Sequence, residues 1–133
     1  MWEISWIAVI AATIIAFVVG GLWYGPLFLK PWQREAGISD ADMQRRHPAK
    51  VFGGAILLQL FAAYFMGHVF ATYGGLSVIS TILTAQGIAL AFIVTALGVN
   101  YLFAGRSLKL FLIDAGYYLV TYTLMGVAFA YLG

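Results

Sequence analysis

Four long apolar segments separated by short polar connections make up most of the chain. They cover about residues 4–28, 51–73, 77–104 and 109–132. A helix needs about 20 mainly apolar residues to cross the hydrocarbon core of a bilayer, and each segment is long enough. The pattern therefore predicts an all-α fold: one transmembrane domain over residues 1–133, built as an integral membrane four-helix bundle.

The connections between these segments predict how the helices follow one another. Only a short turn near residues 105–108 separates the third and fourth segments, so we expect them to form an antiparallel hairpin. The first connection is longer, and Pro31 is expected to interrupt the chain there. Ser39 followed by Asp42 has the spacing of a helix N-cap, which predicts a short helix that ends before Pro48.

Small residues recur at four-residue spacing in two of the apolar segments. Gly21 and Gly25 form one such pair, and Gly87 and Ala91 form another. This spacing allows close approach of membrane helices, either within one chain or between two chains.

The composition excludes several classes of protein. Hydrophobic residues make up 63% of the chain and charged residues 9%, which is too little charge to cover a water-soluble enzyme or a free nucleic-acid-binding domain. The chain has no cysteine, so thiolate chemistry and Cys-ligated metals are excluded. It also lacks a phosphate-binding loop and a zinc-helix motif. We therefore expect no nucleotide, no nucleic acid, no cofactor and no metal.

All basic residues fall on two of the connections, and this asymmetry predicts the orientation. The first connection and the third carry them as follows: Lys30, Arg34, Arg45, Arg46 and Lys50 on the first, Arg106 and Lys109 on the third. Because Lys and Arg concentrate on the cytoplasmic side, we expect residues 30–50 in the cytoplasm and both termini outside the inner (plasma) membrane of the cell. Membrane lipids are the expected partners of these basic side chains.

Few polar residues lie inside the apolar segments. Asp114 and Asn100 are equally far in sequence from Ser107, the midpoint of the third connection, so an antiparallel hairpin places them at one depth. Gln59 lies about 12 Å into the second segment at 1.5 Å per residue, which is near the same level. With Tyr24 of the first segment, these residues predict an intramembrane polar cluster of Asp114, Asn100, Gln59 and Tyr24.

The fourth segment adds a polar stripe to this cluster. Asp114, Tyr117, Tyr118 and Thr121 recur at three- and four-residue spacing, which places them on one helix face. Two interpretations stay open. The cluster is either a hydrogen-bond network that fixes helix packing, which we favour, or the site of a carboxylate that binds a proton or a ligand.

Two motifs carry a family resemblance. The first is Gly20–Phe28, read Gly-Gly-Leu-Trp-Tyr-Gly-Pro-Leu-Phe, and the second combines Asn100–Phe103 with Arg106–Tyr117. Together they resemble a bacterial family of small four-span membrane proteins, domain of unknown function family 1761. The resemblance implies the fold and a membrane location but no activity.

The resemblance also marks positions for attention and shows two departures. The marked positions are Trp23, Tyr24, Pro26, Asn100, Asp114, Gly116 and Tyr117. Tyr118 stands where many relatives have a histidine, and Asp114 stands where Asn is frequent.

Three functions from different classes are compatible with this chain. The favoured one is a non-catalytic accessory or self-assembling membrane subunit, in a homo-oligomer or a larger complex. The alternative is an oligomeric small-solute or proton-linked transporter or channel that uses Asp114, since four helices rarely enclose a pore alone. A membrane enzyme that acts on a lipid-like substrate is the third.

Overall fold

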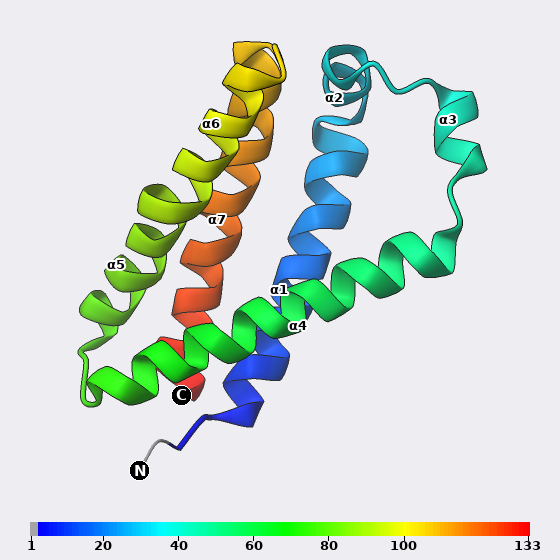
Figure 1. Cartoon of the computed structure of the whole chain (residues 1–133). Coiled ribbons are helices and arrows are strands. Elements are labelled where there is room, and N and C mark those ends of the chain that lie inside the picture. The colour runs from blue at the N-terminus through cyan, green and yellow to red at the C-terminus, as the bar shows by residue number, and fades with distance from the viewer. Residues whose placement is uncertain (1–2) are drawn as a thin grey trace.

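The computed structural model describes residues 3–133, and this part of the chain is helical and contains no strand (Figure 1). It confirms the all-α prediction, and the span ends differ from the predicted ones by at most three residues. Helices of this length and apolar character identify a multi-pass membrane protein. Within residues 3–133, four helical stretches are long and apolar enough to cross a membrane: Trp6–Leu27, Pro48–Tyr73, Val78–Phe103 and Leu108–Leu132.

The first span ends in a bend. It consists of α1 (Trp6–Leu22) and a π-helical turn, η1 (Trp23–Leu27), and α2 (Leu29–Ala36) follows it. The bend lies at Gly25, whose φ of −108° and ψ of −105° are not helical. The prediction that Pro31 interrupts the chain is wrong. Pro31 lies in the first turn of α2, where a backbone N–H has no helical partner to lose.

The first connection contains the predicted short helix, α3 (Asp40–Arg45). The Ser39 hydroxyl accepts from the Asp42 amide at 3.0 Å, and the Asp42 carboxylate accepts from the Ser39 amide at 2.9 Å. This reciprocal capping box confirms the sequence prediction. The next helix, α4 (Pro48–Tyr73), begins with its proline in the first turn, as predicted.

The third and fourth spans form the predicted antiparallel hairpin. The third span is α5 (Val78–Ile88), η2 (Ala89–Val94) and α6 (Thr95–Phe103). A turn at Gly105, whose φ of +67° favours glycine, leads into α7 (Leu108–Leu132). Figure 1 shows the third span running beside α7 over its whole length.

The helix α7 lies at the centre of the arrangement, with α5 on one side and α1 on the other. The second span, α4, crosses α1 obliquely rather than running parallel to it (Figure 1). Its buried residues, Ala63, Met66 and Gly67, all lie in its C-terminal half. The N-terminal half of α4 therefore diverges from the other spans, and this divergence leaves room for a cavity.

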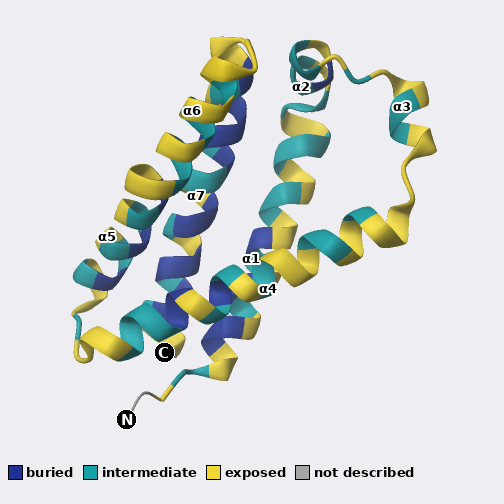
Figure 2. Cartoon of the chain, in the orientation of Figure 1, coloured by how far each residue is buried: buried dark blue, intermediate teal, exposed yellow. Residues whose placement is uncertain are grey.

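Small side chains allow the helices to approach closely. On α1, Ala8, Ala12 and Ala16 are fully buried, and Figure 2 shows buried residues in the N-terminal part of α1 and along α7. A Cβ added to Gly126 of α7 would lie 2.7 Å from the Cβ of Ala85 of α5, so only glycine fits that crossing.

The glycines of the small-residue pairs predicted from the sequence do not lie at close contacts between helices. A Cβ added at Gly21, Gly25 or Gly87 would meet nothing within 4 Å, so these glycines do not bring two helices of this chain together. Large apolar side chains such as Leu58 and Leu102 are exposed on the outer surface, as expected for contact with lipid.

Candidate functional site

Asp114 is the buried acid of the membrane spans. It lies on α7 with 8% of its surface exposed. The Tyr24 hydroxyl donates to Oδ1 at 2.5 Å, and the Tyr101 hydroxyl donates to Oδ2. Side chains from η1 and α6 thus bind both oxygens of a carboxylate on α7, and three spans meet at this residue.

The π-helical turn positions Tyr24 for this contact. The Phe28 amide donates to the Trp23 carbonyl, five residues back, at 2.9 Å, which is the hydrogen bond of a π turn. In the same turn the Trp23 indole N–H donates to the Ile113 carbonyl of α7 at 2.8 Å. Neighbouring side chains of one turn therefore both bind α7, next to Asp114.

The family-motif residues have separate roles at this turn. A Cβ added to Gly116 would lie 2.9 Å from the Trp23 ring, so glycine lets the indole lie directly on α7. Pro26 is exposed at the bend, where it has no N–H to satisfy. Trp23 and Gly116 thus form one contact, whereas Pro26 shapes the turn that positions Trp23.

A second hydrogen-bond network lies beside Asp114. The Gln59 side-chain amide of α4 donates to the Tyr117 hydroxyl at 2.9 Å, and that hydroxyl donates to the Ala16 carbonyl of α1 at 2.9 Å. The ring centroids of Tyr117 and Tyr24 are 5.4 Å apart, so this network is in contact with the one around Asp114. Gln59 and Tyr117 therefore join α4, α7 and α1 at the depth of Asp114.

The predicted stripe on α7 faces the interior. Tyr118 is half-buried, with its ring 5.0 Å from that of Tyr117 and 6.4 Å from that of Tyr122. Thr121 is fully buried. The phenol of Tyr118 thus lies where the family resemblance led us to expect a histidine.

Asn100 does not belong to the cluster. It is exposed on α6, and Tyr101, the next residue, reaches Asp114 instead. The equal sequence distance from Ser107 gave the correct depth but not the direction of the side chain, because successive residues on a helix point about 100° apart. The sequence pattern did not single out Tyr101 as a partner of Asp114, although Tyr101 belongs to the same Asn-Tyr-Leu-Phe motif as Asn100.

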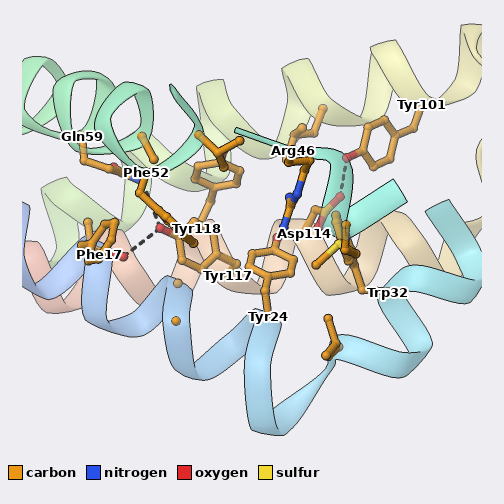
Figure 3. A pocket seen from close by; sticks show the side chains of 18 residues that line it. Phe17, Tyr24, Trp32, Arg46, Phe52, Gln59, Tyr101, Asp114, Tyr117 and Tyr118 are labelled. Carbon is orange, nitrogen blue, oxygen red and sulfur yellow. Dashed lines mark hydrogen bonds between the residues drawn. The ribbon is translucent and has the colours of Figure 1, made fainter. Parts of the chain in front are cut away.

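A cavity of about 650 Å³ lies beside these networks, where the N-terminal half of α4 diverges from α1 (Figure 3). Tyr24, Tyr101, Asp114, Gln59 and Arg46 contribute polar groups to its lining, and aromatic rings form much of the rest. The residues that line it are Ala16, Phe17, Gly20, Gly21, Tyr24, Leu29, Trp32, Met43, Arg46, Val51, Phe52, Ala55, Gln59, Leu97, Tyr101, Asp114, Tyr117 and Tyr118.

The first connection closes one end of the cavity. Arg46, directly after α3, lines the cavity and points into it (Figure 3). The capping box that orders α3 holds the pKa of Asp42 below its usual range, because the Ser39 amide and hydroxyl bond its carboxylate. Asp40 connects α3 to α2 by accepting from Gln33 at 3.0 Å.

A smaller cavity of about 240 Å³ lies further along α7. Tyr122 lines it, together with apolar side chains of α4 such as Phe61 and Phe65. Tyr118 lines the larger cavity, and the centroid of its ring lies 6.4 Å from that of Tyr122, which lines the smaller one.

The larger cavity has the properties of a binding site. Its volume lies in the range of about 300–1,000 Å³ that small-molecule sites occupy. Its apolar walls and few convergent polar groups suit a molecule with a polar head and an apolar body. Within residues 3–133 no group of three or more His, Cys, Asp and Glu side chains could hold a metal ion.

A family model described as "Protein of unknown function (DUF1761)" matches residues 7–130. This match confirms the resemblance carried by the two motifs. No curated protein and no solved structure matches the chain.

Proposed function

We propose that this chain, which belongs to the DUF1761 family, is a non-catalytic membrane subunit that binds an amphiphilic molecule beside Asp114. The observation that carries the proposal is the cavity, which combines a carboxylate and two phenols on one side with aromatic walls on the others. A polar head would lie at Asp114 and an apolar body would lie against the rings.

The position of the cavity suits a ligand that comes from the bilayer. Phe17 and Phe52 line it from α1 and α4, with ring centroids 6.0 Å apart, and both side chains are exposed. An apolar chain that passes between these helices would continue into the surrounding lipid. We place this entrance in the inner leaflet of the plasma membrane, with residues 30–50 cytoplasmic and both termini outside, since the basic side chains lie at this end.

The hydrogen bonding at Asp114 favours binding over catalysis. Both carboxylate oxygens already accept from a phenol, Tyr24 or Tyr101. A general base takes a proton from its substrate, and here each Asp114 oxygen already has a phenol proton within hydrogen-bond reach. We therefore propose that Asp114 orders the site and contributes charge, and that the protein acts as an accessory subunit in a homo-oligomer or a larger complex. The exposed pair of small residues at Gly87 and Ala91 supports close contact with another helix.

Transport is the second candidate, and one specific observation favours it. The two cavities approach each other at α7, where Tyr118 lines the larger one and Tyr122 lines the smaller one, with ring centroids 6.4 Å apart. A change in these side chains would join them into a longer path. Proteoliposomes that release a solute or protons only when the protein is present would establish transport, and Asp114→Asn would then abolish the flux.

The binding proposal is tested by filling the cavity. Gly21 lines it, and a Cβ there would meet nothing within 4 Å, so Gly21→Leu adds bulk to the space without a backbone clash. The matched control is Gly53→Leu, which adds the same side chain to an exposed position of α4 that does not line the cavity.

The readout is photolabelling of the full chain in detergent with a neutral long-chain alcohol that carries a diazirine. We expect labelled peptides to come from the cavity walls around Phe17 and Phe52, and excess unlabelled alcohol to compete. Gly21→Leu should reduce this labelling about tenfold and Gly53→Leu should leave it unchanged. Labelling spread evenly over the exposed helix faces, or unaffected by Gly21→Leu, would contradict the proposal.

A further inference from the structure

We propose that the molecule in the cavity is a hydrophobic organic cation, with the Asp114 carboxylate as its counter-ion. This inference rests on the proposed binding function and specifies the chemical class of the ligand. It is carried by the charges around Asp114, by the aromatic walls and by the position of Arg46.

Among residues 3–133, no Lys or Arg side chain forms an ion pair with Asp114. Its two hydrogen bonds come from neutral phenols, since Tyr24 donates to one carboxylate oxygen and Tyr101 donates to the other. The ion pairs of the first connection join Lys30 to Asp40 and Arg45 to Asp42, and neither involves Asp114. A buried charge without a partner is costly, so the site favours a ligand that brings a positive charge.

The aromatic walls suit a cation better than a neutral molecule. The rings of Tyr24 and Trp32 meet edge to face with centroids 5.5 Å apart, and both line the cavity with Tyr118 and Phe52. Aromatic faces carry a negative electrostatic potential that attracts ammonium and other organic cations. The same walls present apolar surface, which selects a bulky hydrophobic cation over a small hydrated one.

Arg46 supplies the competing charge within the protein. It is exposed, it directly follows α3, and its side chain points into the cavity that contains Asp114 and Tyr24 (Figure 3). A cationic side chain of this protein thus already occupies the space that an organic cation would take. Because Arg46 is not part of a helix, it can leave the cavity when a ligand enters, and its removal should strengthen cation binding.

The experiment compares two ions of the same shape and opposite charge, tetraphenylphosphonium and tetraphenylborate. Each is added to the full chain in detergent, and displacement of the neutral photolabel from the cavity peptides is measured. We expect tetraphenylphosphonium to displace the label at about tenfold lower concentration than tetraphenylborate. Asp114→Asn should raise the concentration of the cation required by about tenfold, and Arg46→Gln should lower it about threefold.

Arg45→Gln is the matched control for Arg46→Gln, since Arg45 is adjacent but pairs with Asp42 outside the cavity. It should leave displacement unchanged. The exposed position of Arg46 makes its variant informative even if Asp114→Asn does not fold.

Preferential displacement by tetraphenylborate would show that the cavity selects an anion and would overturn the inference. Weaker cation binding in Arg46→Gln would overturn it too, because removal of a competing cationic side chain cannot weaken the binding of a cation. Labelling of the cavity that neither ion displaces would overturn the cation while the proposed binding function stands. No labelling of the cavity by the neutral alcohol would overturn both.

Discussion

Tyr101 on α6 donates its hydroxyl to the carboxylate of Asp114 on α7, across the short turn that joins these two helices. The contact is local in sequence, since the residues are 13 positions apart. Tyr24 reaches the same carboxylate from a turn 90 positions away. Asp114 therefore links the hairpin of the third and fourth spans to the end of the first span. Substitutions of Asp114 and of its hydrogen-bond partners test this arrangement of the helices.

Removing the Tyr101 hydroxyl should destabilise the fold. Tyr101→Phe keeps the ring but deletes a hydrogen bond to a buried carboxylate, so we expect a loss of about 1–2 kcal/mol in the free energy of unfolding. Thermal unfolding in detergent measures this. The control is Asn100→Ala at the adjacent exposed position, expected to change stability by less than about 0.5 kcal/mol. An equal loss in both variants would contradict the assignment of Tyr101 as the partner.

Substitutions of Asp114 should separate hydrogen bonding from charge. Asp114→Asn keeps polar atoms in reach of Tyr24 and Tyr101, so it should fold and retain most of the stability. Asp114→Leu leaves two phenol hydroxyls without their acceptor and should destabilise by about 1–3 kcal/mol. Thermal melts of both variants in one detergent provide the comparison. A Leu variant as stable as the native chain would show that the buried polar contacts contribute nothing to packing.

The crossing of α5 and α7 should not tolerate a larger residue than glycine. Gly126→Ala would place a methyl group 2.7 Å from the Cβ of Ala85 and 3.2 Å from the Ile82 backbone, neither of which can rotate away. We expect a loss of about 1–3 kcal/mol from overpacking. Gly87→Ala is the control, because nothing lies within 4 Å of its added Cβ and alanine favours helix by about 1 kcal/mol. Equal stability of Gly126→Ala and Gly87→Ala would show that α5 and α7 do not contact each other closely at Gly126.

The proposed orientation can be tested with single cysteines in this cysteine-free chain. Ala41→Cys on α3 and Tyr73→Cys at the far end of α4 are both exposed, and neither alters the Ser39 cap. With residues 30–50 cytoplasmic, a membrane-impermeant maleimide added to intact cells should label position 73 and not position 41. The reverse labelling would invert the topology, and the proposed leaflet of the cavity entrance with it.

The sequence determined the depth of the polar residues but not their directions. Tyr24, Gln59 and Asp114 were expected at one level, and all three line one cavity. Asn100 was expected with them and is exposed instead. Depth follows from counting residues along a helix of constant rise, whereas direction depends on how each helix is rotated against its neighbours. That rotation is set by packing contacts such as the one between Gly126 and Ala85.

The four spans, the hairpin and the capped helix α3 follow from local rules, because apolar length, short turns and the pairing of Ser39 with Asp42 act within a few residues. The π-helical turn that aims Tyr24, the oblique path of α4 and the cavity between them depend on contacts between distant parts of the chain. Trp23 bonds to Ile113 and Tyr24 bonds to Asp114, both over 90 residues. An apolar pattern is satisfied by many arrangements of four helices in a membrane, and only these long-range contacts select the one that places a carboxylate, two phenols and Arg46 around a single cavity.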